Sequence, residues 1–193
     1  MTPVLRSIAV DKLSGVSAHF KCEHLQVTGS FKFRGALNSV LSLDGPARQR
    51  GVVTHSSGNH GAALAAAAAR ETIPCTVVVP NSTPEHKLQN MQKYGANVVL
   101  CEPTQKGRHD TMMAEAEKMG GATVVHPYDT LTVIAGQGTI GLELLQQVPS
   151  LDAILVPTSG GGMVTGIAVA ATAIKPGIRV IAVEPRGKRL AGT

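Results

Sequence analysis

A lysine between two aromatic residues is the first feature of this 193-residue chain that could do chemistry. Lys32 lies between Phe31 and Phe33, and the chain has only three phenylalanines. Apolar rings beside the ammonium group would shield it from water, which lowers its pKa and favours the neutral amine. A neutral amine can condense with a carbonyl compound, whereas a lysine whose stem lies on the surface keeps its charge. The segment by itself leaves both interpretations open.

A glycine-rich loop follows a predicted strand late in the chain. Residues 153–156 are apolar, residues 160–162 are three consecutive glycines, and the segment after them has a helical pattern. Without Cβ atoms, successive backbone N–H groups can converge on one anion, and a helix N-terminus adds partial positive charge. A flexible turn would need only one glycine. We therefore predict a phosphate site, and the absence of a Gly-Lys-Ser/Thr ending excludes a nucleotide P-loop.

A second polar loop, at residues 54–61, also lies between a predicted strand and a predicted helix. Its serine and asparagine side chains suit a carboxylate or a ring hydroxyl, whereas helix capping would explain only one of them. His55 and His60 are five residues apart, which is not the spacing of metal ligands on a helix, and no cysteine or acidic residue is near them in the sequence. We predict a binding loop without a metal.

Residues 136–141 match the pattern G-x-G-x-x-G, which occurs in dinucleotide-binding folds. That function needs a clear strand before the motif and an acidic residue about 20 positions after it. Residues 132–135 form only a short, weak strand candidate, and no acidic residue stands at that distance. The motif is interpreted as a helix entry built from small residues. A dinucleotide-binding oxidoreductase domain is the least favoured alternative.

The elements that must position these residues alternate along the chain. Short apolar runs are separated by helical patterns, as in a parallel sheet with helices on its faces. The predicted strands are 19–23, 52–54, 76–79, 97–100, 123–125, 153–156 and 179–183. The predicted helices are 31–43, 61–69, 84–94, 108–119, 138–148 and 163–174. This pattern predicts an α/β fold in which 51–129 form a compact unit inserted into another built from both ends.

Composition excludes several classes of function. Hydrophobic residues make up 43% and charged residues 16%, with a net charge of +5, so intrinsic disorder is not expected. Aromatic residues are only 3%, and the basic residues are scattered, which argues against nucleic-acid binding. No apolar stretch is long enough to span a membrane, and no signal peptide is evident. Three widely spaced cysteines indicate neither disulfides nor a zinc site, so we expect a cytoplasmic protein.

The order of these motifs resembles that of the fold-type II pyridoxal-phosphate enzymes, and within them the serine racemase and serine/threonine dehydratase (ammonia-lyase) family. The matching segments are 30–36, 56–61, 126–127, 133–139 and 159–163. The resemblance covers essentially the whole chain. It implies a tryptophan synthase β-like α/β fold, with 1–50 and 130–193 in an incomplete large cofactor-binding domain and 51–129 in a small inserted domain.

The resemblance also implies roles for single residues. Lys32 would hold pyridoxal phosphate as a Schiff base and take the Cα proton of the substrate, and Ser57 would be the second acid/base of a racemase. Ser57 could instead only cap the helix that follows it. The cofactor-binding residues would be Phe31, Lys32, Asn59, Ser159, Gly160, Gly161, Gly162 and Met163. The substrate-binding residues would be Ser56, Ser57, Asn59 and His60.

The chain departs from the family pattern in three places. Ser159 replaces the first of four glycines, and its hydroxyl can still donate to a phosphate. The family's cation site would use Glu184, but Leu190 stands where an aspartate is expected, which argues against bound Mg²⁺ or Ca²⁺. The chain also stops well short of the family's full extent, so a fragment or a truncated gene product is expected.

The function implied is that of an L-serine or L-threonine ammonia-lyase, which releases ammonia and an α-keto acid, or of a serine racemase. The alternative is a catalytically inactive fragment that binds the cofactor. We expect a small amino-acid substrate, no nucleic-acid or membrane partner, and a homodimer in the full-length form.

Overall fold

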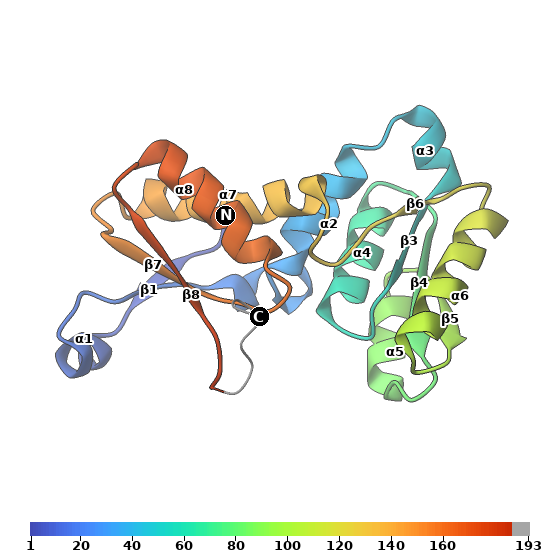
Figure 1. The fold of residues 1–193 in the computed structure, drawn as a ribbon, viewed down its shortest axis with the longest axis horizontal. Coiled ribbons are helices and arrows are strands. Elements are labelled where there is room, and N and C mark those ends of the chain that lie inside the picture. Colours follow the sequence, from blue (N-terminus) through green and yellow to red (C-terminus); the bar gives the residue numbers. More distant parts are fainter. Residues whose placement is uncertain (187–193) are drawn as a thin grey trace.

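The structure, a computed structural model, describes residues 1–186. Its elements form two groups, one around the strands of residues 52–124 and one built from the two ends of the chain (Figure 1). The first group contains a four-stranded parallel sheet with the strand order β5-β4-β3-β6. Its strands are β3 (Val52–His55), β4 (Cys75–Pro80), β5 (Asn97–Cys101) and β6 (Thr123–Val124). The predicted α/β fold with a parallel sheet is confirmed.

Both faces of this sheet are covered by helices, which explains why its central strands are continuous apolar runs. Val77 packs in the core cluster with helix α4 (Asn59–Arg70), and the next residue, Val78, packs on the other face with helix α6 (Gln105–Lys118). The alanines of α4 are nearly all buried, because their small side chains let the helix lie close to the sheet. Helix α5 (Glu85–Gln92) packs against α4.

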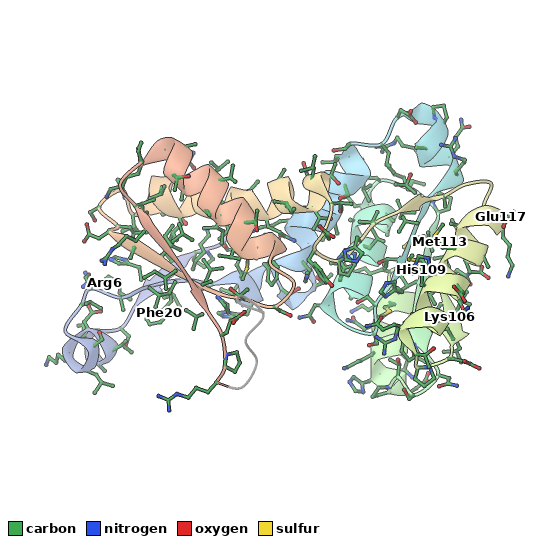
Figure 2. All side chains as sticks on the ribbon, viewed as in Figure 1. Arg6, Phe20, Lys106, His109, Met113 and Glu117 are labelled. Atoms are coloured by element: carbon green, nitrogen blue, oxygen red, sulfur yellow. The ribbon has the colours of Figure 1, made fainter. Side chains whose placement is uncertain are left out.

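Helix α6 illustrates how the sequence forms a surface helix. Met112 and Ala116, four residues apart, are buried in the cluster that faces the sheet. Thr104 caps the first turn by accepting a hydrogen bond from the N–H of Gly107. Figure 2 labels four exposed side chains spaced three or four residues apart along this helix, Lys106, His109, Met113 and Glu117.

The second group holds two small sheets and three long helices. Its strands are the antiparallel pair β1 (Val4–Arg6) and β2 (His19–Lys21), and the parallel pair β7 (Ala153–Pro157) and β8 (Arg179–Val183). The long helices are α2 (Lys32–Leu41), α7 (Leu131–Gln147) and α8 (Gly162–Ile174). The short ones are α1 (Ile8–Ser14), η1 (Glu23–Leu25) and η2 (Val27–Gly29). Helix α3 (Gly45–Arg50) lies on the side of the first group (Figure 1). Figure 1 shows α1 projecting at one end of the molecule.

The prediction for residues 132–148 was wrong about where the helix begins. The weak strand candidate at 132–135 forms the first turn of α7, so the G-x-G-x-x-G motif lies inside a helix and not at its entry. A Cβ on Gly136 would lie 2.6 Å from the carbonyl oxygen of Arg34 in α2, and one on Gly138 would lie 2.9 Å from the carbonyl oxygen of Gly166 in α8. The motif therefore brings three helices together and does not form a dinucleotide loop.

Helix α2 lies between the two groups (Figure 1) and contacts both α4 and α7. All four strands of the large sheet fall within residues 51–129, and the division of the chain into two domains stays a prediction. The elements β1, α1 and α3 were not predicted from the sequence.

Among residues 1–186, no helix has the length and apolarity needed to cross a membrane.

Candidate functional site

A cavity of about 290 Å³ lies between the start of α2 and the loop that joins β7 to α8. The carboxyl end of a parallel strand and the N-terminus of the following helix meet at this loop, which is the usual place for a ligand in such a fold. The residues that line the cavity are Phe31, Lys32, Tyr128, Pro157, Thr158, Ser159, Gly160, Gly161, Gly162, Met163 and Val164. The structure thus brings the predicted lysine and the predicted glycine loop to one place.

The amine of Lys32 is held among a carbonyl and two aromatic rings. Its Nζ donates to the carbonyl oxygen of Pro127 at 2.7 Å and lies 5.1 Å from the ring centroid of Phe31 and 6.0 Å from that of Tyr128. Burial lowers the pKa of Lys32, as the sequence predicted. Phe33, in contrast, is 5% exposed in the core. The second ring is therefore Tyr128, which sequence reasoning missed.

The loop between β7 and α8 requires glycine at three positions, for two different reasons. Gly161 precedes the first turn of α8 with φ of 85°, a left-handed conformation that favours glycine. A Cβ on Gly160 would lie 2.2 Å from the ring of Tyr128, and one on Gly162 would lie 2.4 Å from its carbonyl oxygen. Within the described part of the chain, no side chain caps α8. Its free N–H groups and its dipole can therefore bind an anion.

The polar loop lies outside the residues that line this cavity. Asn59 is the exposed first residue of α4, and Ser56 Oγ accepts a hydrogen bond from the N–H of Gly58 at 3.3 Å. Helix α4 is preceded by Gly58, and no side chain of residues 1–186 makes a capping hydrogen bond to it. Ser57 is half-buried, and because Gly58 is the N-cap residue and α4 has no side-chain capping bond, Ser57 is not the helix cap of its alternative interpretation.

His60 is a buried neutral histidine. Its ring is 3% exposed, and Nε2 lies 3.1 Å from the carbonyl oxygen of Val125. A carbonyl oxygen only accepts, so the ring proton is on Nε2, and Nδ1 has no partner among the described residues. Burial lowers the pKa of His60 to about 4, and the hydrogen bond to Val125 offsets only part of that effect. In this arrangement the ring has no free N–H to donate to a carboxylate.

Residues 125–128 connect the polar loop to the cavity. The carbonyl oxygen of Val125 accepts a hydrogen bond from His60, and that of Pro127 accepts one from Lys32. Tyr128 packs on the glycine loop. The ring of His126 lies edge-on to Tyr128, with centroids 4.6 Å apart, and to His55, with centroids 6.3 Å apart. The sequence indicated only the His-Pro pair of this segment, through its match to the family.

The predicted cation site falls at the edge of the described residues. Glu184 directly follows β8 and is half-buried, and Leu190 lies outside residues 1–186. Within that range, no three or more His, Cys, Asp or Glu side chains gather in a group that could hold a metal ion. The expectation that Mg²⁺ or Ca²⁺ is not bound stays a prediction.

Comparison with known proteins identifies the family. The sequence model of the family described as "Pyridoxal-phosphate dependent enzyme" matches residues 1–193. The chain belongs to this family. The resemblance inferred from the motifs is confirmed.

Several members of the pyridoxal-phosphate dependent enzyme family are similar over nearly the whole chain. Serine racemase of Arabidopsis thaliana is 50% identical over 186 residues, which are 96% of this chain and 56% of that protein. The crystal structure of serine racemase from Dictyostelium discoideum has a TM-score of 0.93 and 47% identity, over 96% of this chain and 60% of that one. The processed form of threonine deaminase isoform 2 from Solanum lycopersicum has a TM-score of 0.92 and 34% identity, over 97% and 55%. The chain spans little more than half the length of these relatives.

The cavity fits the cofactor of the family. Pyridoxal phosphate presents an aldehyde, an aromatic ring and a phosphate. The cavity offers the desolvated amine of Lys32, the rings of Phe31 and Tyr128, and the uncapped N-terminus of α8. The backbone of the loop approaches Tyr128 so closely that only glycine fits at 160 and 162. The donor set and the cradle therefore match the three parts of the molecule.

Proposed function

We propose that this protein uses pyridoxal phosphate to act on L-serine or L-threonine, either removing the β-hydroxyl and the amino group or racemising serine. The observation that carries the proposal is the desolvated Lys32 amine opposite an uncapped helix N-terminus in one cavity. Support also comes from relatives named serine racemase and threonine deaminase.

The proposed roles follow from these surroundings. Bound pyridoxal phosphate supplies an electron sink that acidifies the Cα proton of an amino acid. Lys32 would attach the cofactor and, as a neutral amine, accept that proton. Ser159, Gly160, Gly161, Gly162 and Met163 would hold the phosphate, and Phe31 and Tyr128 would exclude water from the amine. Asn59 would contact the ring hydroxyl, and Ser56 and Ser57 would bind the substrate.

Turnover of serine tests the proposal directly. The protein loaded with pyridoxal phosphate is incubated with L-serine or L-threonine, and α-keto acid, ammonia and D-serine are measured. Formation of any of these products above a cofactor-only control supports the proposal. Cofactor attachment without turnover would support the alternative of a catalytically inactive cofactor-binding chain.

The proposed setting of the protein is a cytoplasmic homodimer in its full-length form. The three cysteines are free and buried, as is usual in a reducing compartment. Cell fractionation and analytical ultracentrifugation of the full-length form test these two statements.

The substitution Gly161→Asp should weaken cofactor binding by about tenfold or more, which corresponds to about 1.4 kcal/mol. The aspartate brings a negative charge to the helix N-terminus that would bind the phosphate, and it strains a residue whose φ is 85°. The affinity is measured by titrating the protein with pyridoxal phosphate and following its absorbance. The control is Gly161→Asn, because asparagine tolerates a left-handed backbone and is uncharged. An aspartate variant that binds as tightly as the asparagine variant would contradict the phosphate assignment.

The substitution Ser57→Ala should abolish D-serine formation, by a factor of about 100 or more, while β-elimination continues. Racemisation needs a proton donor on the face of the substrate opposite Lys32, and elimination does not. D-serine and the α-keto acid are both measured, with protein that has been shown to turn over serine. The control Ser56→Ala removes a hydroxyl from the same loop, and we expect it to raise KM for both reactions alike. Racemisation that persists in the Ser57 variant would mean that another group serves the far face.

A further inference from the structure

A buried cluster of charged side chains lies behind the lysine that faces the cavity. Arg34 follows Lys32 by two residues, which places the two side chains about 200° apart around helix α2. Arg34 is 7% exposed and plays no part in the cavity lining. Its contacts are of interest because they fix the helix turn that carries Lys32.

The guanidinium of Arg34 bridges two carboxylates from different elements. Nε and Nη2 donate to the two oxygens of Glu23 in η1, both at 2.8 Å. Nη1 and Nη2 donate to the two oxygens of Glu143 in α7, at 2.7 and 2.9 Å. Further bonds run to the hydroxyls of Thr139 and Thr2, at 3.1 and 3.2 Å. Such paired bonds define the direction of a guanidinium more closely than a single contact can.

Charge within the cluster is nearly balanced. Lys21 is also 7% exposed, and its Nζ donates to Glu143 at 2.6 Å and to Gln147 at 2.8 Å. Burial raises the pKa of Glu143, but the hydrogen bonds from Arg34 and Lys21 outweigh it and lower that pKa to about 2. Burial likewise lowers the pKa of Arg34, and its bonds to the two carboxylates reverse the shift and raise it. Glu143 and Arg34 therefore stay ionised at neutral pH.

Apart from the packing of Phe33 in the core, few contacts other than those of Arg34 hold the start of α2. Phe31 precedes the helix, and no described side chain caps its first turn. The N–H groups of Phe33 and Arg34 make bonds of 3.5 and 3.1 Å to carbonyls only three residues back. The backbone at Arg34 also touches α7, where Gly136 leaves room for the Arg34 carbonyl. The first turn is thus fixed from the side of η1 and α7.

We infer that Arg34 is a positioning residue for Lys32: by binding Glu23 and Glu143 it holds the first turn of α2 so that the Lys32 amine stays desolvated beside Phe31 and Tyr128. This inference rests on the role proposed for Lys32. It predicts that loss of the Arg34 contacts changes the chemistry of the amine and not only the stability of the fold.

The experiment measures the reactivity of the Lys32 amine in the folded protein freed of pyridoxal phosphate, which would otherwise occupy that amine. Acetic anhydride labels neutral amines, so the pH dependence of labelling at Lys32, followed by mass spectrometry, reports its pKa. In Arg34→Met the midpoint should rise by about one pH unit, because the amine regains water. Arg34→Lys keeps the charge but not the paired bonds, and it should shift the midpoint in the same direction by less. If Arg34→Met fails to fold, the Arg34→Lys variant still tests the inference.

The matched control is Lys21→Met, which removes an equally buried cation from the same carboxylate, Glu143, but lies on β2. Urea denaturation should show a comparable loss of stability in both methionine variants, while the Lys32 midpoint stays unchanged in the control. An unchanged midpoint in both Arg34 variants, or an equal shift in Lys21→Met, would overturn the inference. Attachment of pyridoxal phosphate to unsubstituted Lys32 is scored separately after borohydride reduction. Its absence would contradict the proposed function and leave the labelling result to decide the role of Arg34.

Discussion

Replacement of Lys32 by alanine should abolish covalent attachment of pyridoxal phosphate to the protein. Lys32 supplies the amine that lines the cavity and lies close to the α8 N-terminus, and burial lowers its pKa toward the reactive neutral form. The measurement is borohydride reduction of the loaded protein, followed by peptide mass spectrometry. The unsubstituted protein should carry the cofactor on the peptide that contains Lys32. In the variant, no peptide should carry a stoichiometric amount of cofactor.

Two control variants separate loss of the amine from other effects of the substitution. Lys87→Ala removes an exposed lysine of α5 and should leave attachment unchanged. Lys32→Arg keeps a long cationic side chain in the cavity but offers no amine for condensation, so it should behave as the alanine variant does. A borohydride-stable cofactor on another lysine in Lys32→Ala, at the level of the unsubstituted protein, would refute the assignment.

Replacement of Gly166 by alanine should destabilise the protein by about 3 kcal/mol. A Cβ at this position would lie 2.2 Å from the carbonyl oxygen of Ile134 and 2.7 Å from the backbone nitrogen of Gly138. Backbone atoms inside a helix cannot rotate away as a side chain does, so α7 and α8 would have to move apart. Equilibrium unfolding in urea measures the loss in free energy of unfolding, and the dependence of that free energy on urea concentration should be the same in both proteins.

The chain offers a matched control in Gly177→Ala. No described atom lies within 4 Å of a Cβ at Gly177, so this variant should change the free energy of unfolding by about 0.5 kcal/mol or less. Because α8 begins at the glycine loop, Gly166→Ala should also weaken cofactor binding, whereas the control should not. Equal stabilities of the two variants would contradict the close packing of α7 on α8.

Local sequence patterns predicted most of the fold because they depend on neighbouring residues. All six strands predicted after residue 50 are present, and their ends differ from the prediction by two residues or fewer. A buried parallel strand needs a short apolar run whatever surrounds it, and that run is visible in the sequence. Helix α3 was missed although it carried a signal: Asp44 caps it by accepting from the N–H of Ala47 at 2.8 Å.

The start of α7 shows where local pattern was insufficient. Val133 and Ile134 are β-branched and favour a strand, yet they lie in the first turn of a helix. Val133 is completely buried in the core cluster shared with α2 and α4. Packing of α7 between α2 and α8 outweighs this propensity, because the glycines of the same segment allow helix backbones to touch.

The sequence by itself determined the α/β class, the lysine and the glycine loop, and hence the family. Only the tertiary structure decided which groups surround the lysine. Phe31 and Phe33 are equal neighbours in the sequence, but a helix turns about 100° per residue, so one lines the cavity and the other enters the core. The place of the second ring is taken by Tyr128, and Arg34 meets Glu143 across 109 residues. Contacts of this kind depend on how helices and loops pack, which no local pattern of residue types encodes.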